Sequence, residues 1–472
     1  MDTCFSRSTK TNLVKKTAVV SEEMTSQIRL RLLPSARCLF DEPVQVKVTG
    51  LRSRQVVTMR ARSTDEKGVV FSSSAIYRAD GSGEVDLERD PSLSGSYVGV
   101  EPMGLLWSMR ADTLHKLFSK NKVLNPHVVK FSVHELEGEG RMLAEATNER
   151  FLIGDGVSRV PVKEGSFHGV LFTPPGEGPF PAVLDMCTFM SEKRACLLAN
   201  KGFVVLAVSV YNDKPENVTE LHLEFFKEAV DFLQQQPKLQ SDKLRSVCQQ
   251  DRKIITECSE QAEELAFELQ VRNKGVGILS ISKAGDIALS LAAFVPGVEA
   301  VVWINGCSAN AITPLYYKKS KILSPLLIDL SKAIPTESGA VIGKYCLKNP
   351  LAEENQATLV PIEKAKGHFL FVASEDDLNW DSKAHMDQVV ERLKHHGKEN
   401  FESVCYPGAG HLLEPPYGPH CHSSFHLFAW QLAMWGGEPR SHAAAEVHLW
   451  KKIQEFLRSH LSCETSRPTA KL

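Results

Sequence analysis

Alternating apolar and polar residues characterise the chain from residue 27 to residue 135. Short β-branched or alternating segments are separated there by Gly, Ser, Pro or Asp: QIRLRLL, VQVKVTG, QVVTMRARS, VVFSSSAIYRA, GEVDLERD, SYVGVEP and, later, HVVKFSVHEL. Strands at this spacing predict a β-sandwich, which we place at residues 27–150. Residues 1–26 are expected to be a disordered extension, and residues 136–165 a linker that leads into the next domain.

The pattern changes at residue 166, where apolar strands begin to alternate with amphipathic helices. The expected strands include FPAVLDMC, FVVLAVSV, GVGILSIS, VEAVVWING, HFLFVASED and FESVCYPGAG, and the expected helices include MSEKRACLLANKG, VTELHLEFFKEAVDFLQQQPK and HAAAEVHLWKKIQEFLRSHL. Strands that are apolar throughout, with helices between them, are typical of a mostly parallel sheet covered on both faces. We therefore predict an α/β domain with a doubly wound sheet at residues 160–462.

Residues 240–272 interrupt this alternation. The segment is charged, partly helical in pattern, and stands where a short helix-to-strand connection is expected. Long excursions of this kind are usually lids, interaction loops or disordered segments. We treat it as an insertion in the α/β domain, and residues 463–472 as a flexible tail.

Composition excludes some functions. The chain has 472 residues, 43% of them hydrophobic, and a formal net charge of -2. The sequence has no basic block that would neutralise nucleic-acid phosphates, so we expect no nucleic-acid partner. The eleven cysteines form no C-x-x-C pair, which argues against a zinc ribbon or a disulfide framework and fits a reducing compartment. No apolar run approaches the roughly 20 residues that span a bilayer.

The two ends of the sequence bear on localisation. The last three residues, Ala470-Lys471-Leu472, are of the Ser-Lys-Leu type that the peroxisomal import receptor binds. The first residues, MDTCFSRSTKTNLVKK, are basic, rich in Ser and Thr, and lack the apolar core of a secretory signal. We expect a peroxisomal protein, with the cytosol and the mitochondrion as alternatives.

A candidate nucleophile lies in the segment GILSISKAGDIAL. Ser282 ends an apolar strand, and a turn of small residues leads into a helix. This is the arrangement of a nucleophile elbow, which lifts a serine hydroxyl above the sheet and usually has the pattern Gly-x-Ser-x-Gly. Here Ser280 and Ala284 replace the two glycines, but both are small. On this motif alone, an ordinary serine at a strand end is the competing interpretation.

An acid and a histidine follow in the order that such a fold requires. The strand HFLFVASED ends in Glu375, Asp376 and Asp377, and the loop after FESVCYPGAG carries His411. Ser, then an acid, then His is the chain order of the triad in this fold class. The residues alone leave the choice between Asp376 and Asp377 open, and a helix-capping acid and a loop histidine are the competing interpretations.

The residue types suggest acyl transfer through a covalent ester. Serine is a weak nucleophile, so His411 must accept its proton, while the acid orients the imidazole. The backbone N–H of Lys283 would supply one donor of the oxyanion hole, because it follows the nucleophile. The second donor is expected near Cys187–Phe189, after the strand FPAVLDMC. No cofactor and no metal are implied.

Other conspicuous residues have simpler interpretations. The thiols of Cys187, Cys196, Cys307 and Cys405 lie in apolar sequence and are expected to be buried and inert. The histidines at 420, 422 and 426 lack an acidic or cysteine partner at ligand spacing, which favours a surface loop over a metal site. Trp107 and Trp435 are expected to be core or interdomain anchors.

At this point the motifs identify a family. From about residue 27 to about residue 462 the chain resembles the type-I acyl-CoA thioesterases and the related bile acid-CoA:amino acid N-acyltransferases. The resemblance rests on DEPVQVKVTGL (41–51), GSYVGVEPMGLLWSM (95–109), GVGILSISKAGDIALS (275–290), YPGAGHLLEPPY (406–417) and WGGEPRSHAAAEVHLWKKIQ (435–454). It implies a β-sandwich joined to an α/β-hydrolase domain, a fatty acyl-CoA substrate, and a triad of Ser282, Asp377 and His411.

The resemblance covers two activities. The conjugating enzymes are known for cysteine at the nucleophile position and the thioesterases for serine, so Ser282 favours hydrolysis; transfer to glycine or taurine is the first alternative. Relatives have a Gly-rich segment where this chain has DMCTFMSEKRA. A catalytically weakened acyl-CoA-binding homologue is therefore the second alternative. We expect a monomer or a weak oligomer.

Overall fold

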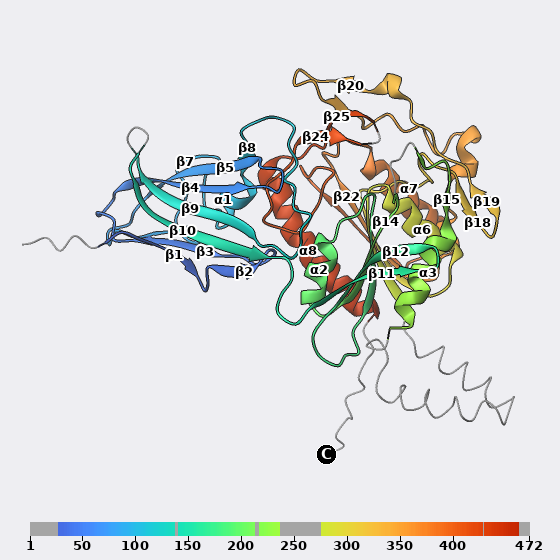
Figure 1. Ribbon diagram of the computed structural model, residues 1–472. Coiled ribbons are helices and arrows are strands. Elements are labelled where there is room, and N and C mark those ends of the chain that lie inside the picture. The colour runs from blue at the N-terminus through green and yellow to red at the C-terminus, as the bar shows by residue number, and fades with distance from the viewer. Residues whose placement is uncertain (1–26, 137–139, 213–216, 237–274, 428, 462–472) are drawn as a thin grey trace, which may run out of the picture.

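The structure is a computed structural model that describes residues 27–136, 140–212, 217–236, 275–427 and 429–461. Two parts are visible in Figure 1: a β-sandwich, and a larger part in which helices flank a central sheet. The predicted extension at 1–26, the insertion at 240–272 and the tail at 463–472 lie outside the described residues. None of the described helices is long and apolar enough to cross a membrane.

The sandwich consists of two sheets. One has the strand order β1-β3-β6, and the other has the order β2-β10-β9-β4-β5-β7 with β8 beside β5. All pairs are antiparallel except β2 with β10. The strands are β1 (Arg29–Leu33), β2 (Arg37–Leu39), β3 (Gln45–Thr49), β4 (Val56–Thr64), β5 (Val70–Arg78), β6 (Val85–Asp86), β7 (Ser94–Gly95), β8 (Arg110–Ala111), β9 (His127–Glu135) and β10 (Met142–Phe151).

Alternation determines which face of the larger sheet is buried. On β4 the side chains of Val57, Met59 and Ala61 point inward and are fully buried, while Arg60 and Arg62 point outward. Successive side chains of a strand point to opposite faces, so the apolar half of the pattern forms the core. The short helix α1 (Gly104–Trp107) is buried against this core, and Trp107 packs within it.

The expectation of a linker at residues 136–165 was wrong. This segment contains β10, which is paired along its length with β9, and β11 (Ser158–Glu164), the first strand of the next sheet. The pattern was hidden because β10 turns polar side chains inward: the amide of Asn148 donates to the Ala36 carbonyl, and the guanidinium of Arg150 donates to the Phe40 carbonyl. The expected strand SYVGVEP (96–102) is also wrong: β7 (Ser94–Gly95) ends just before it, and within it only Gly99 forms an isolated bridge, to Ser92.

The larger part is built on an eight-stranded sheet of order β11-β12-β14-β13-β16-β17-β22-β23. The pairs β11–β12 and β12–β14 are antiparallel, and the remaining pairs are parallel. Its remaining strands are β12 (Phe167–Thr173), β13 (Ala182–Cys187), β14 (Val204–Ser209), β16 (Val276–Ile281), β17 (Val298–Ile304), β22 (His368–Ser374) and β23 (Phe401–Tyr406).

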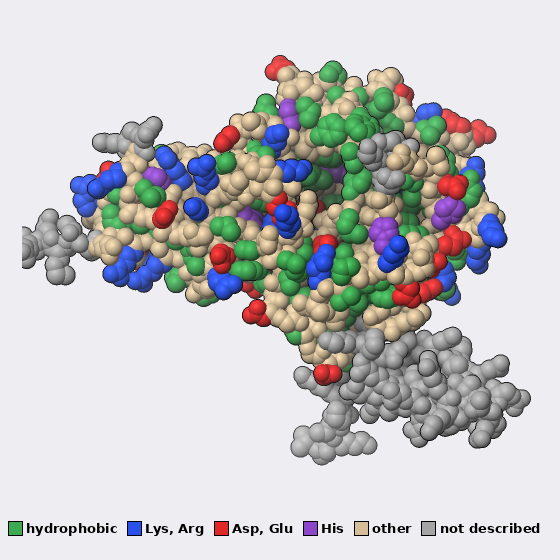
Figure 2. Space-filling model, viewed as in Figure 1, with side chains coloured by type: hydrophobic (Ala, Val, Ile, Leu, Met, Phe, Trp, Pro, Cys, Tyr) green, Lys and Arg blue, Asp and Glu red, His purple; other side chains and the backbone are tan. Residues whose placement is uncertain are grey.

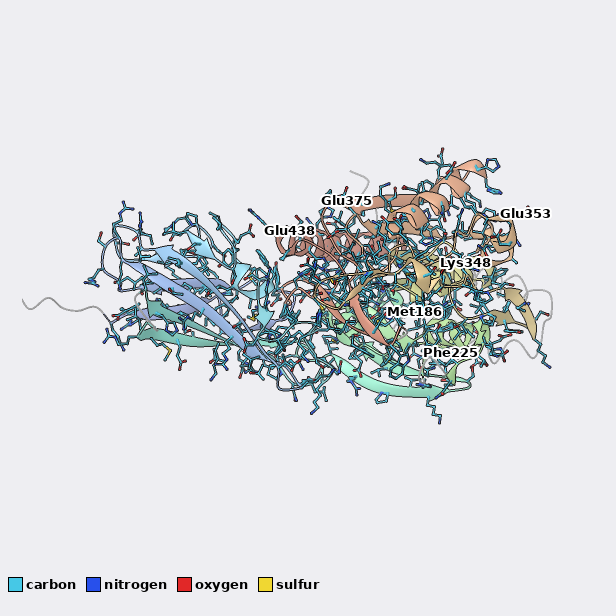
Figure 3. All side chains as sticks on the ribbon, turned by 90° about the horizontal axis from the view of Figure 1, so that it is seen from above. Met186, Phe225, Lys348, Glu353, Glu375 and Glu438 are labelled. Carbon is cyan, nitrogen blue, oxygen red and sulfur yellow. The ribbon has the colours of Figure 1, made fainter. Side chains whose placement is uncertain are left out.

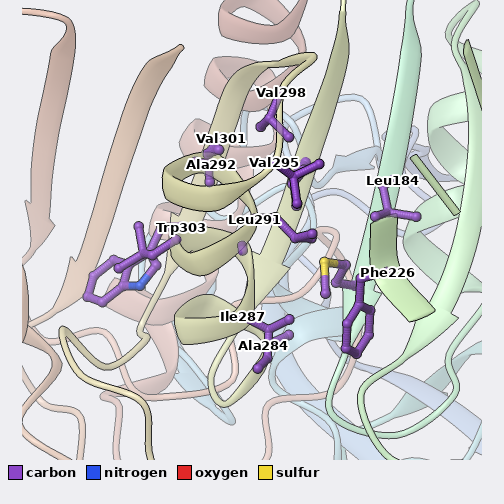
Figure 4. Close-up of a cluster of buried hydrophobic side chains, with 14 of the residues drawn as sticks. Leu184, Phe226, Ala284, Ile287, Leu291, Ala292, Val295, Val298, Val301 and Trp303 are labelled. Atoms are coloured by element: carbon purple, nitrogen blue, oxygen red, sulfur yellow. The ribbon is translucent and has the colours of Figure 1, made fainter. Parts of the chain in front are cut away.

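Helices cover both faces of this sheet. One buried cluster joins it to α3 (Leu223–Gln234), α6 (Ala284–Phe294) and α7 (Ser382–His395), and another joins it to α2 (Lys193–Asn200) and α8 (Pro439–Leu461). Figure 4 shows the first cluster, in which Ile287 and Leu291 of α6 lie among Phe226 of α3 and Leu184 of β13. The prediction of a mostly parallel, doubly wound α/β-hydrolase domain after a β-sandwich is confirmed.

Smaller elements surround the sheet. They form the sheet β15-β18-β19 and the sheet β20-β21-β25-β24. Their bounds are β15 (Leu221–His222), β18 (Leu315–Tyr317), β19 (Ser320–Leu323), β20 (Ile334–Pro335), β21 (Val341–Ile342), β24 (Ser423–His426), β25 (Gln431–Met434), η3 (Leu330–Lys332), η4 (Glu353–Thr358) and η5 (Ile362–Lys364).

The two parts are in direct contact. The indole of Trp450 on α8 donates to the Asp41 carboxylate of the sandwich at 2.8 Å. The guanidinium of Arg150 on β10 lies 5.8 Å from the ring centroid of Tyr417. Seen from above, Met186 of β13 lies within the larger part, whereas Glu438, just before α8, lies on its side toward the sandwich (Figure 3).

Candidate active site

Ser282 lies in a strained turn between β16 and α6. Its φ angle is +58°, in the left-handed region that non-glycine residues rarely adopt. The surrounding structure holds this conformation: the N–H of Ser282 donates to the Ile304 carbonyl at 2.9 Å, and the N–H of Gly285 donates to the Ser282 carbonyl at 2.8 Å. Strain of this kind at a strand-to-helix turn is the mark of a nucleophile elbow.

The residues around Ser282 show why the altered elbow sequence is tolerated. Ser280 is buried, and its hydroxyl donates to the Val302 carbonyl of the neighbouring strand at 3.0 Å. Ala284 is fully buried at the start of α6. The glycine that the packing does need is Gly285, because a Cβ there would lie 2.8 Å from the indole nitrogen of Trp303. The position that must be glycine for close packing is therefore 285 rather than 284.

His411 lies between a hydroxyl and a carboxylate. Its Nε2 is 2.9 Å from the Oγ of Ser282, and its Nδ1 is 2.7 Å from Oδ2 of Asp377. The ring is almost fully buried. It stacks on Trp435 and meets the edge of Trp380, with both centroid distances 5.7 Å. The structure thus brings together the three residues that the sequence and the resemblance single out.

The neighbouring acids have other partners. Oδ1 of Asp377 accepts hydrogen bonds from the backbone N–H groups of Asn379 and Trp380, which fix the carboxylate. Asp376 instead accepts from the N–H of Gly437 at 2.7 Å. Glu375 accepts from the N–H of Gly408 and is exposed. Of the three consecutive acids, Asp377 is the one in contact with His411.

Sequence reasoning missed two asparagines at this site. The amide of Asn305 donates to the His411 carbonyl at 2.8 Å and to the hydroxyl of Ser374 at 3.0 Å, and its oxygen accepts from the Ser374 N–H. The amide nitrogen of Asn379 lies 3.2 Å from Nε2 of His411. Asparagine in a loop has many ordinary uses, so only the position of Asn379 two residues after the candidate acid could have marked it.

The expected oxyanion region contains two buried ion pairs. Lys283 immediately precedes α6, and its ammonium group pairs with Asp286 at 2.7 Å, both side chains being buried. Met186 pairs with Ser280 across the sheet, so Cys187 lies beside the end of the strand that precedes Ser282. The guanidinium of Arg194 pairs with Asp185 at 2.6 Å and donates to the Met186 carbonyl at 3.0 Å. The buried Arg194 side chain therefore fixes the end of β13.

The thiols near the site are poor nucleophiles. Burial raises the pKa of Cys187 to about 12, and burial likewise raises the pKa of Cys307 to about 12. Since the thiolate is the reactive form of cysteine, both side chains are inert at neutral pH. Cys196 is also buried, whereas Cys405 is half-buried rather than buried as expected.

The expectation of a surface loop for the three histidines was wrong for two of them. His426 stacks on Trp435, and His420 hydrogen-bonds to the Gly436 carbonyl; both are half-buried, and only His422 is exposed. Burial lowers the pKa of His420 to about 3 and that of His426 to about 4, so both are neutral at pH 7. Among the described residues, no group of three or more His, Cys, Asp or Glu side chains could hold a metal ion.

Comparison with known proteins agrees with this architecture. Residues 41–164 match the family model of the acyl-CoA thioester hydrolase/BAAT N-terminal region, and residues 260–463 match that of the BAAT/acyl-CoA thioester hydrolase C terminal. Acyl-coenzyme A thioesterase 6 of Homo sapiens is 39% identical over 451 residues, which is 94% of this chain and 99% of that protein. The chain belongs to the acyl-CoA thioester hydrolase/BAAT family.

Other members are similar over comparable lengths. Acyl-coenzyme A thioesterase 1 of Homo sapiens is 40% identical, covering 92% of this chain and 96% of that protein. The mitochondrial acyl-coenzyme A thioesterase 2 of Homo sapiens is 40% identical, covering 92% and 84%. Among solved structures, an acylaminoacyl peptidase of Pyrococcus horikoshii matches at 14% identity and a TM-score of 0.37, covering 90% of this chain and 61% of that one. A structural similarity of that size supports no conclusion about activity.

Proposed function

We propose that this family member is an acyl-CoA thioesterase that hydrolyses fatty acyl-CoA to the free acid and CoA. The observation that carries the proposal is the continuous hydrogen-bonded series from Ser282 through His411 to Asp377. The series lies at the strained turn between β16 and α6, where Ser282 is half-buried, and a turn of this kind lifts a serine hydroxyl above the sheet. The relatives named as acyl-CoA thioesterases support the same substrate class.

In the first half of the reaction, Ser282 Oγ attacks the thioester carbonyl as His411 Nε2 takes the hydroxyl proton. Asp377 holds Nδ1 of the imidazole as a donor, so that Nε2 is the free acceptor, and stabilises the imidazolium that forms. Collapse of the tetrahedral intermediate breaks the C–S bond. The imidazolium returns its proton to the sulfur, and CoA leaves as the thiol while the acyl group stays on Ser282 as an ester.

The negative charge on the carbonyl oxygen needs hydrogen-bond donors at this stage. We assign these to the backbone N–H of Lys283 and to an N–H of the segment after Cys187. The ion pair of Arg194 with Asp185 supports the second position, because it fixes the end of β13. Loss of one such donor typically costs about 100- to 1000-fold in rate.

In the second half, His411 removes a proton from the water that attacks the acyl ester. Collapse of the second tetrahedral intermediate breaks the bond from the acyl carbon to Ser282 Oγ, the imidazolium returns its proton to that oxygen, and the fatty acid is released. The choice of serine favours water as the acceptor. An acyl-serine is an ordinary ester, whereas an acyl-cysteine would be a thioester that amines attack readily. Cys187, at the end of β13, does not compete with Ser282 as the nucleophile, because burial raises its pKa to about 12 and keeps the thiol protonated.

The test is release of CoA from palmitoyl-CoA, measured with a thiol reagent. We expect release by the natural protein and its loss in Ser282→Ala. The control is Ser290→Ala on α6, whose hydroxyl only donates to the Asp286 carbonyl and which should keep its activity. Release that persists in Ser282→Ala would reject the serine mechanism.

Transfer to an amino acid is the second candidate, since the matching family model is named for BAAT as well as for the thioester hydrolases, and the sequence also resembles the bile acid-CoA:amino acid N-acyltransferases. Glycine or taurine added to the same assay would give an N-acyl conjugate in place of free acid. If no acyl-CoA of any chain length is hydrolysed or transferred but CoA esters still bind, the protein is an acyl-CoA-binding homologue.

We also propose that the protein acts in the peroxisome. The support is the terminal Ala470-Lys471-Leu472, which resembles the signal of the peroxisomal import receptor. Fusion of the last ten residues to a fluorescent reporter should give peroxisomal puncta that are lost when Leu472 is removed. Diffuse or mitochondrial fluorescence of the full-length protein would reject this location.

A further inference from the structure

The outward face of the larger sandwich sheet carries an unusual concentration of positive charge. Arg60 and Arg62 on β4, Lys130 on β9 and Arg110 on β8 are all exposed; we refer to these four residues as the basic stripe. Figure 2 shows Lys and Arg side chains spread over this part of the surface, toward the hollow between the two parts of the molecule. The chain as a whole is nearly neutral, with a net charge of -2. The charge is therefore local.

Strand register places these residues in a row. Lys130 is directly opposite Arg62, Arg62 is opposite Ser72 on β5, and Ser72 is opposite Arg110. Strands in a sheet are about 4.8 Å apart, so Arg110 and Arg62 are separated by about 10 Å with a serine hydroxyl between them. Arg60 lies in the next outward row. The row crosses four strands without an acidic residue in it.

Like charges directly opposite one another destabilise a sheet. Arg62 and Lys130 form such a pair, and within the described part of the chain no member of the basic stripe has an ion pair or a side-chain hydrogen bond. The nearest outward-facing acids by register are Glu145 and Glu149 on β10, and Glu149 already pairs with Arg37. Among the described residues none of these acids forms an ion pair with the stripe, so an anionic ligand would supply the counter-charge.

The stripe begins beside the candidate active site. The backbone N–H of His420 donates to the carbonyl of Trp107 at 3.3 Å, three residues before Arg110. His420 hydrogen-bonds to the Gly436 carbonyl at 3.2 Å. Trp435, which precedes Gly436, stacks on the ring of His411. Its carbonyl accepts a hydrogen bond from the backbone N–H of His411. A ligand attached to the reacting carbonyl by a flexible arm could therefore extend from His411 past Arg110 and along the sheet.

We propose that the basic stripe binds the 3′-phosphate and the diphosphate of the CoA moiety, so that the sandwich recognises the leaving group of the substrate. This proposal rests on the proposed thioesterase function. Arginine forks suit phosphate oxygens because they donate in pairs, and Ser72 offers a further donor between them. CoA carries its phosphates at the end of the pantetheine arm remote from the sulfur, as the position of the stripe requires.

A negatively charged lipid surface is the other anion source that such a face could meet. CoA is favoured because the stripe is a narrow row that continues toward His411, whereas binding to a bilayer requires no connection with the catalytic residues. The comparison between the two sources is part of the test.

The main experiment uses two decanoyl thioesters, one of CoA and one of N-acetylcysteamine, which lacks all phosphates. The variant is Arg62→Glu with Lys130→Glu. We expect the ratio of kcat/KM for the CoA ester to kcat/KM for the short thioester to fall at least tenfold, mainly through KM. The control is Arg29→Glu with Arg31→Glu, two exposed arginines on β1 of the other sheet, which should leave the ratio as it is. A ratio that is unchanged in the stripe variant would overturn the proposal.

A binding measurement separates this proposal from the proposed function. Calorimetry with CoA and with dephospho-CoA on the Ser282→Ala protein requires no turnover. We expect weaker binding of dephospho-CoA, and a loss of that difference in the stripe variant. If the natural protein hydrolyses neither thioester but this result holds, the thioesterase function fails and the stripe remains a CoA site. Equal binding of CoA by the stripe variant and the natural protein, with binding to anionic vesicles only in the latter, would assign the stripe to a lipid surface and reject our proposal.

Discussion

In the central sheet of the hydrolase domain, β13, β14 and β16 are buried at every position, whereas β4 and β5 of the sandwich are buried only at alternate positions. Helices cover both faces of the hydrolase sheet, so its strands can expose functional side chains only at their ends. Ser282, Asp377 and His411 all follow strand ends. The larger sandwich sheet has an exposed face, and its charged side chains lie within the strands rather than at their ends. In our proposals the reaction takes place at strand ends of the covered sheet, and CoA is bound by the exposed face of the sandwich sheet.

The largest expected effect concerns the strand ends. Asp377→Asn keeps the shape of the side chain but removes the charge that orients His411, and we expect kcat for decanoyl-CoA to fall by about 10⁴-fold. Asp376→Asn is the matched control, since the Asp376 carboxylate accepts its hydrogen bond from the Gly437 N–H and does not contact the histidine. Equal losses in both variants would show that the loop, and not the acid, is what matters.

The fully buried sheet should also be less tolerant of an unpaired ion. Arg194→Met leaves Asp185 buried without its cation, and we expect the free energy of unfolding to fall by about 3–5 kcal/mol in chemical denaturation. Replacing Asp185 by Leu in the same protein should restore a large part of this loss, because the uncompensated charge is gone. If the double variant is less stable than the single one, the ion pair is not the cause. Exposed Arg62→Gln in the sandwich should change stability by less than about 0.5 kcal/mol.

A smaller effect is expected at Asn305, which follows β17 and hydrogen-bonds to Ser374 at the end of β22 and to the His411 carbonyl. Asn305→Gly tolerates the backbone φ of +46° but removes the donors to the His411 carbonyl and to Ser374. We expect a loss of about 1–3 kcal/mol in the free energy of unfolding and a lower kcat, with KM little affected. A loss of stability without any change in kcat would mean that Asn305 does not help to position His411.

The smallest expected effect depends on pH. Burial lowers the pKa of His385 from 6.5 to about 4, so its contribution to stability is present above pH 6.5 and is lost as the pH falls toward 4. The difference in unfolding free energy between the natural protein and His385→Asn should narrow by about 1.5 kcal/mol from pH 6.5 to pH 5. His395→Asn, an exposed position on the same helix, should show no such dependence. A constant difference for His385→Asn would contradict the assignment of a neutral buried imidazole.

The sequence by itself determined the fold class, because continuous apolar strands and alternating strands are imposed by burial on two faces or on one. It also placed a serine, an acid and a histidine, in that order, each after a different strand of the predicted sheet. It failed at β10, where buried Asn148 and Arg150 find hydrogen-bond partners far away in the chain, which no local pattern can reveal. It could not separate Asp376 from Asp377, since adjacent residues in a loop differ only in the direction of their side chains.

Only the tertiary structure decided which residues are neighbours. Arg62, Arg110 and Lys130 are scattered among residues 62–130 with no basic block, and strand pairing alone assembles them into a row. His420 and His426 have the spacing of a surface loop, yet packing against Gly436 and Trp435 half-buries them beside the candidate site. Periodicity along the chain indicates which side chains of a segment are buried and which are exposed. It carries no information on which other segment packs against them. That information depends on long-range contacts, which form only when the whole chain folds.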